Sequence, residues 1–251
     1  MGHIIATVGK GGTGKTTLAS LLIRHLVRLN KRPILAIDAD ANDNLGDGIG
    51  MKKAGSIAWV TDDFFKNKAN FPEGMTKETF LEQQLNLVLT EGKDVDLLVM
   101  GHPEGAGCYC YINNILRAQM EKLGTNYPYV VVDNEAGMEH VSRRTTRRID
   151  TMLLVADFSA KAIKAAGRIK EVANELALEV NRMALVLNRA PADISPLAKA
   201  VEETGLPLWA TLPNSAAVLE NDIQGQSVFT LPDNDPVVTA TGELVGKIVK
   251  G

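Results

Sequence analysis

Short apolar runs recur along the chain, and each one ends in small or polar residues. The runs occupy residues 4–8, 33–38, 96–100, 129–133, 151–155, 183–188 and 207–212. Their near-continuous apolar content is typical of strands that are covered on both faces of a parallel sheet. The pattern therefore predicts a buried sheet built from these segments.

Between the runs, apolar residues follow a helical period instead. In residues 16–28, Leu18, Leu22 and Leu26 recur at every fourth position, which predicts a helix with one apolar face. Similar patterns occupy residues 111–123, 161–178 and 195–203. Strands that alternate with helices predict an α/β fold, with a mostly parallel sheet covered by helices on both faces.

The alternation extends over residues 1–251, so we expect a single domain. Residues 42–90 are its least regular part. We expect an insertion there that contains short helices, and an edge strand stays an open alternative.

Composition and charge narrow the class of protein. Of 251 residues, 45% are hydrophobic and 23% are charged, as in an ordinary soluble globular protein. A net charge of -3 argues against broad nucleic-acid binding, which needs a basic surface. The arginines within residues 143–148 could form a local basic patch, but a solvated or interface helix face is the simpler interpretation.

No apolar run approaches the roughly 18 residues of a membrane span, and the chain enters a predicted strand at once, so we expect no secretory signal and a cytoplasmic protein.

Residues 9–16 read Gly-Lys-Gly-Gly-Thr-Gly-Lys-Thr and lie between a predicted strand and a predicted helix. This is the pattern of a phosphate-binding loop, whose glycines let successive backbone N–H groups turn toward phosphate oxygens. Lys15 would reach the terminal phosphates, and the Thr16 hydroxyl would bind Mg²⁺. The other loop residues expected to contact ATP or ADP are Gly11, Gly12, Thr13, Gly14 and Thr17.

Carboxylates lie at the ends of two predicted strands. Asp38 and Asp40 follow the second apolar run, and Asp133 follows the fourth. Ligands of parallel α/β sheets bind beyond the C-terminal ends of the strands, so these groups are expected beside the phosphate loop. Strand alternation would direct Asp38 and Asp40 to the same side. Helix caps and turns are the structural alternative.

The chain has two cysteines, Cys108 and Cys110, which are one residue apart. A disulfide in so tight a ring would be strained, whereas thiolates favour Ni²⁺, Zn²⁺ or iron–sulfur clusters. A closed site usually has four ligands, so two chains related by a twofold axis would complete it. Buried free cysteines are the alternative. His102 and His140 could each add a ligand, although a single histidine in a turn is more often structural.

The second lysine of the loop, Lys10, gives residues 10–17 a further resemblance. Lys-Gly-Gly-Thr-Gly-Lys-Thr-Thr resembles the deviant Walker A loop of the MinD/ParA/nitrogenase iron protein class. The resemblance implies that Lys10 reaches the nucleotide of the other subunit in a dimer, and that Asp40 orients or deprotonates the attacking water. It also implies that Asp38 and Asp133 support Mg²⁺. The residues that would sense the γ-phosphate or contact the adenine are Gly137, Asn188, Arg189 and Pro213.

The Cys-x-Cys pair makes the resemblance more specific, because the whole chain then resembles the CooC-type nickel-insertion accessory ATPases. That family implies an ATPase that forms a homodimer with ATP and Mg²⁺ and holds Ni²⁺, or Zn²⁺, between four cysteines. It implies delivery of nickel to a client enzyme, either carbon monoxide dehydrogenase or acetyl-CoA synthase.

Two rival functions remain open. An iron–sulfur ATPase of the nitrogenase iron protein type would also use four cysteines per dimer, although that family draws them from separate segments. A positioning ATPase of the MinD/ParA kind would bind a membrane or DNA. The end of the chain, residues 241–250, contains two glycines and few large apolar residues, so we expect no amphipathic membrane helix there and neither a membrane nor a nucleic-acid partner.

Overall fold

The protein is built around a parallel sheet, as the apolar runs predict. The computed structural model describes residues 2–66, 74–101, 110–135 and 148–250. Its seven strands have the order β3-β2-β4-β1-β5-β6-β7, and all neighbouring pairs are parallel. The strands are β1 (His3–Gly9), β2 (Ile34–Ala39), β3 (Val95–Val99), β4 (Tyr129–Asn134), β5 (Arg148–Asp157), β6 (Glu179–Asn188) and β7 (Leu208–Leu212).

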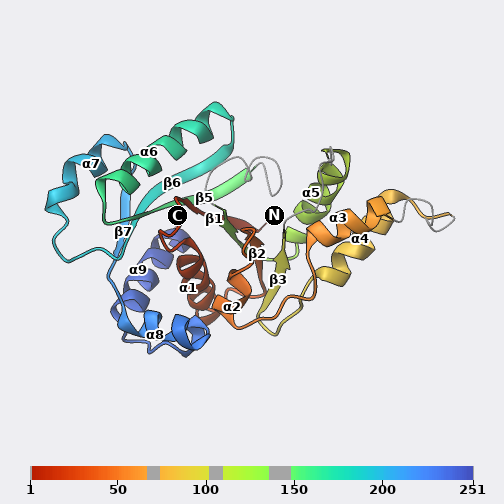
Figure 1. Ribbon diagram of the computed structural model, residues 1–251, viewed down its shortest axis with the longest axis horizontal. Coiled ribbons are helices and arrows are strands. Elements are labelled where there is room, and N and C mark those ends of the chain that lie inside the picture. The colour runs from red at the N-terminus through yellow and green to blue at the C-terminus, as the bar shows by residue number, and fades with distance from the viewer. Residues whose placement is uncertain (1, 67–73, 102–109, 136–147, 251) are drawn as a thin grey trace.

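Helices cover both faces of the sheet (Figure 1). Those of the described residues are α1 (Lys15–Arg28), α2 (Leu45–Ile49), α3 (Ile57–Lys66), α4 (Lys77–Val88), α5 (Cys110–Gly124), α6 (Ala160–Glu175), α7 (Ala198–Glu203), α8 (Ala216–Gln224) and α9 (Pro236–Lys250), with the 3₁₀ turns η3 (Ser195–Leu197) and η4 (Val228–Thr230). The fold class predicted from the sequence is confirmed.

Alternation along the strands divides the core into two layers. In β1, Ile4 and Val8 pack in a cluster with α3 to α6, whereas Ile5 packs in a second cluster with α1, α2 and α9. Both sides of the strand are buried, which explains why β1 is apolar apart from His3 and Thr7. Helices packed on both faces of the sheet therefore hold the ends of its strands in fixed positions.

The insertion is more helical than expected. Residues 42–90 contain α2, α3 and α4, and the edge strand does not form among the residues described there. Only an isolated antiparallel bridge joins Thr90 to Leu97 of β3. The helix predicted at 195–203 is also divided, because η3 precedes the short α7.

The end of the chain forms a regular helix, although the two glycines within residues 241–250 are unfavourable inside a helix. Helix α9 packs on β7 and α1 and buries Val238, Leu244 and Ile248. A Cβ atom at Gly242 would lie 3.1 Å from His25 Cε1, so this glycine permits close packing of α9 on α1. In the part of the chain that is described, no helix is both long and apolar enough to cross a membrane.

Candidate nucleotide-binding site

The C-terminal ends of β1, β2, β4 and β6 bring the polar groups predicted from the sequence to one edge of the sheet. Asp133 of β4 pairs in register with Thr7 of β1 and with Asp38 of β2. The phosphate loop continues from β1 into α1 at the same edge (Figure 1). This is the position at which parallel α/β sheets bind ligands.

The phosphate loop has the backbone that its glycines allow. Gly12 has φ 79° and Gly14 has φ 88°, a left-handed conformation that favours glycine. The N-cap residue of α1 is Gly14, which has no side chain to cap the helix, and the first turn contains no acidic residue. The N–H groups of that turn and the positive end of the helix are therefore available to an anion.

Two side chains of the loop turn back onto it. The Thr13 hydroxyl donates to the Lys10 carbonyl at 2.8 Å, and Lys15 Nζ donates to the same carbonyl at 3.4 Å. Lys15 is buried, whereas Lys10 is exposed. The two lysines thus differ as expected if Lys15 serves the nucleotide of its own chain and Lys10 is free to reach elsewhere.

Asp133 of β4 accepts hydrogen bonds from two hydroxyl groups, one on α1 and one on β1. Thr16 donates to Asp133 Oδ2 at 2.5 Å, and Thr7 donates to Asp133 Oδ1 at 2.9 Å. Burial raises the pKa of Asp133 to about 6, although the two hydroxyls and the charge of Lys15 oppose that rise. Thr7 was missed by the sequence reasoning; the signal was a hydroxyl residue inside an otherwise apolar strand.

Asp38 holds the turn that follows β2. Its carboxylate accepts the N–H of Leu45 at 2.8 Å and the N–H of Asp40 at 3.1 Å. Burial raises the pKa of Asp38 to about 7, the Leu45 N–H lowers it, and the charge of Asp133 raises it further.

Asp40 lies outside the strand, because β2 ends at Ala39, so strand alternation does not place its side chain. It is half-buried, and its carboxylate accepts two hydrogen bonds from Asn42, at 2.8 and 2.9 Å.

The hydroxyl and carboxylate groups at this edge of the sheet suit a Mg²⁺ ion that takes only a few of its ligands from the protein. Thr16, Asp38 and Asp133 supply hard oxygen atoms, which Mg²⁺ prefers. The ionised forms of both carboxylates are disfavoured by burial, and a divalent cation would offset that cost. Among the residues described, no group of three or more His, Cys, Asp or Glu could hold a metal by itself. A site that shares Mg²⁺ with nucleotide phosphates and water does not need one.

A pocket of about 400 Å³ lies beside the loop, between α1 and α8. Asn188, Arg189 and Pro213, predicted to contact the adenine, all line it, together with Thr17. Sequence reasoning missed the wall that α8 supplies, because no pattern had identified that helix. Its lining residues are Val218, Leu219 and Asp222.

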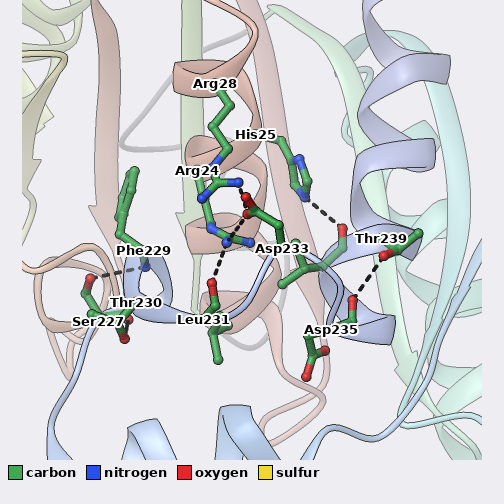
Figure 2. A network of polar contacts seen from close by, with 11 residues as sticks. Arg24, His25, Arg28, Ser227, Phe229, Thr230, Leu231, Asp233, Asp235 and Thr239 are labelled. Atoms are coloured by element: carbon green, nitrogen blue, oxygen red, sulfur yellow. Dashed lines mark hydrogen bonds and ion pairs between the residues drawn. The ribbon is translucent and has the colours of Figure 1, made fainter.

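Polar contacts hold the segment that follows α8, and Figure 2 shows those around Arg24 and Asp233. Ser215 lines the pocket, caps α8 and donates to Asp235 at 2.8 Å. The segment before Asp235 is bound to α1, because the fully buried Arg24 donates to the Leu231 carbonyl at 2.6 Å and to Asp233 at 2.8 Å. Figure 2 shows Arg28 directed to the same Asp233 carboxylate, with which it forms an ion pair.

Several predicted site residues lie outside the described residues. They are Cys108, Gly137, His102 and His140. Cys110 is the first residue of α5, and its side chain is outside the description. The geometry of the Cys-x-Cys pair therefore stays a prediction.

The profile of one protein family, described as the CobQ/CobB/MinD/ParA nucleotide binding domain, matches residues 4–228. The chain belongs to this family. A relative in it, an uncharacterised ATP-binding protein of Methanocaldococcus jannaschii, is 38% identical over 249 residues, which cover 98% of each chain. The carbon monoxide dehydrogenase accessory protein CooC of Rhodospirillum rubrum is 26% identical over 243 residues, or 90% of this chain and 89% of that protein.

The fold of this family member is also similar to solved structures. The MinD cell division protein of Aquifex aeolicus superposes with a TM-score of 0.72 at 20% identity, over 100% of this chain and 98% of that one. This likeness concerns the fold alone.

Proposed function

We propose that this family member is an ATPase whose nucleotide cycle controls dimerisation and the binding and insertion of nickel. The observation that carries the nucleotide part is the contact of Thr16 with Asp133 at 2.5 Å, which joins the phosphate loop to the carboxylate at the end of β4. Lys15 binds the terminal phosphates, the loop N–H groups surround them, and the pocket lined by Asn188, Arg189 and Pro213 takes the adenine.

When bound, Mg²⁺ neutralises charge on the phosphates during transfer. Thr16, Asp133 and Asp38 serve its coordination shell, directly or through water. Asp40 orients or deprotonates the attacking water. Its hydrogen bonds from Asn42 support this role, because they hold the carboxylate in place at the same edge of the sheet.

Lys10 acts across a homodimer. Its exposed position on the loop supports contact with the nucleotide of a second subunit, where the cation would offset charge that develops on the phosphates. ATP would then favour the closed dimer, and hydrolysis would favour its opening. Gly137 responds to the γ-phosphate in this cycle.

Nickel is the proposed cargo, held by Cys108 and Cys110 of two subunits. Two features support this: the Cys-x-Cys sequence, and the similarity to CooC over nine-tenths of the chain. The client would be a nickel–iron–sulfur enzyme, either carbon monoxide dehydrogenase or acetyl-CoA synthase. Zn²⁺ would fit the same thiolates.

The test is nickel binding by the Cys108→Ser/Cys110→Ser double variant, measured by equilibrium dialysis with a non-hydrolysable ATP analogue. We expect loss of nickel binding with unchanged ATP affinity. Nickel bound with unchanged stoichiometry and affinity would contradict the cargo assignment. Iron and visible charge-transfer absorption in the purified protein would instead support an iron–sulfur ATPase.

A second candidate is a positioning ATPase of the MinD kind, which the similarity to the septum site-determining protein MinD of Thermotoga maritima favours, at 27% identity over 191 residues. MinD-type membrane binding uses a C-terminal amphipathic helix, and here α9 ends with Lys247 and Lys250. However, Leu244, Val245 and Ile248 of α9 are buried in the core. Sedimentation with anionic vesicles and ATP tests this candidate, and binding to them would favour it over nickel delivery.

A further inference from the structure

Two consecutive residues at the end of β6 bind two consecutive carbonyl groups of the phosphate loop. Asn188 Nδ2 donates to the Thr13 carbonyl at 2.9 Å, and Arg189 Nη2 donates to the Gly12 carbonyl at 2.5 Å. Asn188 approaches the loop so closely that a Cβ atom at Gly14 would lie 2.1 Å from Asn188 Nδ2. The same two residues also line the pocket next to the loop.

The backbone at this point has an uncommon conformation that makes the double contact possible. Arg189 has φ 52°, in the left-handed region that few residues other than glycine adopt. Asn188 Oδ1 accepts the Arg189 N–H at 3.0 Å, and the next N–H, from Ala190, donates to the Leu212 carbonyl of β7 at 2.9 Å. Neighbouring side chains of a continued strand point to opposite faces, whereas this bend brings both onto the loop.

We propose that Asn188 and Arg189 are positioning residues that preorganise the phosphate loop, a role beyond contact with the base. The inference rests on the proposed nucleotide-binding function. In a trans peptide, a carbonyl and the N–H that follows it point in opposite directions. Binding the Gly12 and Thr13 carbonyls toward β6 therefore turns the N–H groups of Thr13 and Gly14 to the opposite side of the loop.

The remaining contacts of the loop fit this role. Within the described part of the chain, the Thr13 N–H donates to the Lys10 carbonyl alone, at a long 3.4 Å, so it can exchange that partner for a phosphate oxygen at small cost. The Gly14 N–H directly precedes the uncapped start of α1. Donors that are already oriented bind an anion without the cost of ordering the loop.

A base contact and a positioning role predict different patterns of loss. If the two side chains only contact the base, their removal lowers the affinities for AMP and ATP by the same factor. If they orient the loop, the loss grows with the number of phosphates and includes a polyphosphate that has no base. The hydrogen bonds at stake join loop N–H groups to charged phosphate oxygens, and losing such bonds weakens affinity by about tenfold to a hundredfold.

The experiment measures the affinities of Mg·ATP, AMP and Mg·tripolyphosphate by displacement of a fluorescent ATP analogue, for the wild-type protein and for Asn188→Ala and Arg189→Ala. We expect Mg·ATP and Mg·tripolyphosphate to weaken by about tenfold or more, and AMP by less than about threefold. Equal losses for ATP and AMP, or unchanged tripolyphosphate affinity, would overturn the inference. Unfolding temperatures near that of the wild type establish that the variants are folded.

Conservative variants separate the hydrogen bond of Arg189 from its charge. Arg189→Gln keeps a donor without the charge, and Arg189→Lys keeps the charge without the planar group. Recovery of ATP affinity in Arg189→Gln supports positioning through the Gly12 carbonyl. Recovery in Arg189→Lys alone would assign Arg189 to direct attraction of phosphate and overturn its positioning role.

Failure of this inference is distinct from failure of the proposed function. A wild-type protein that binds none of the three ligands would contradict the nucleotide site itself. A wild-type protein that binds them, with variants that bind equally well, would contradict only the positioning role.

Discussion

The Thr16 hydroxyl and the Asp133 carboxylate meet at 2.5 Å, which joins the first turn of α1 to the end of β4. The carboxylate is fully buried, and burial is the main cause of its raised pKa. The contact therefore places a group whose ionisation is disfavoured at the point where a Mg²⁺ ion is expected. Such a group lowers the stability of the apo protein and serves the ligand.

Asp133→Asn should separate these two effects. The amide can keep a hydrogen bond to each hydroxyl, since hydroxyl groups both donate and accept, and no charge has to be buried. We expect the free energy of unfolding at pH 7.5 to rise by about 1–2 kcal/mol, while ATP hydrolysis falls more than about a hundredfold. Urea denaturation and phosphate release measure the two changes.

The exposed carboxyl of Asp193 provides the matched control. Hydrogen bonds from Ser195 lower its pKa, so Asp193→Asn should bring no gain in stability and no loss of hydrolysis. A destabilised Asp133→Asn protein with normal hydrolysis would contradict the role of Asp133.

The pH dependence follows from the raised pKa values of Asp38, about 7, and Asp133, about 6, against an ordinary value of 3.8. A carboxyl with a raised pKa takes up a proton on folding, so the stability of the apo protein should fall as pH rises from about 4 to about 7. Mg²⁺ needs the ionised forms, so the affinity for Mg·ATP should rise over pH 5.5 to 8 by about tenfold or more.

Calorimetry in two buffers of different ionisation enthalpy measures the protons released on binding. We expect release of about one proton near pH 6.5 in the presence of Mg²⁺. Affinity that is constant across this pH range would show that neither carboxyl serves the metal.

Lys15→Ala should abolish ATP hydrolysis, because no other buried lysine is found among the described residues of the loop. The expected loss is about a thousandfold, which is typical for removal of a cation that stabilises transferred phosphate. Lys199→Ala is the control, since Lys199 is 88% exposed and pairs weakly with Glu203 at 4.0 Å. Equal hydrolysis by the two variants would refute the assignment of Lys15.

Asp233 should be far more important for stability than its 68% exposure indicates. Its carboxylate binds Arg24, which is fully buried and has two nitrogen atoms that find no hydrogen-bond partner among the described residues. Asp233→Ala removes the carboxylate that contacts this buried cation, so we expect a loss of about 1–3 kcal/mol in urea denaturation. Glu203→Ala, which removes an equally exposed partner from the exposed Lys199, should cost less than about 0.5 kcal/mol.

A double variant tests the cause. Arg24→Met in the Asp233→Ala background removes the buried charge, so it should recover most of the lost stability. A double variant that is less stable than Asp233→Ala would mean that packing, and not charge, explains the effect.

Much of the fold was predictable because its strands are buried on both faces. The apolar run of β4 ends at Asp133, and the run of β1 contains Thr7, the hydroxyl residue that donates to Asp133. The phosphate loop was predictable because its glycines are required by positive φ at Gly12 and Gly14. These signals depend on neighbouring residues in the sequence, so they can be recognised without knowledge of the tertiary structure.

Other features depend on contacts between distant segments. Glycines are unfavourable inside a helix, yet α9 forms because Gly242 fits against His25 and the apolar residues of α9 reach the core. The turn of Asp40 away from β2 depends on where that strand ends. The contact of Asn188 with the Thr13 carbonyl joins residues 175 positions apart, which no local pattern could indicate.

The most direct test of the proposed function is a nickel titration followed by sedimentation velocity, in three states: without nucleotide, with ADP, and with a non-hydrolysable ATP analogue. We predict one nickel ion per dimer, bound most tightly in the state with the ATP analogue, and loss of that binding in Cys108→Ser/Cys110→Ser. Nickel affinity and subunit assembly that do not depend on the nucleotide would contradict the proposal that the ATP cycle controls the metal.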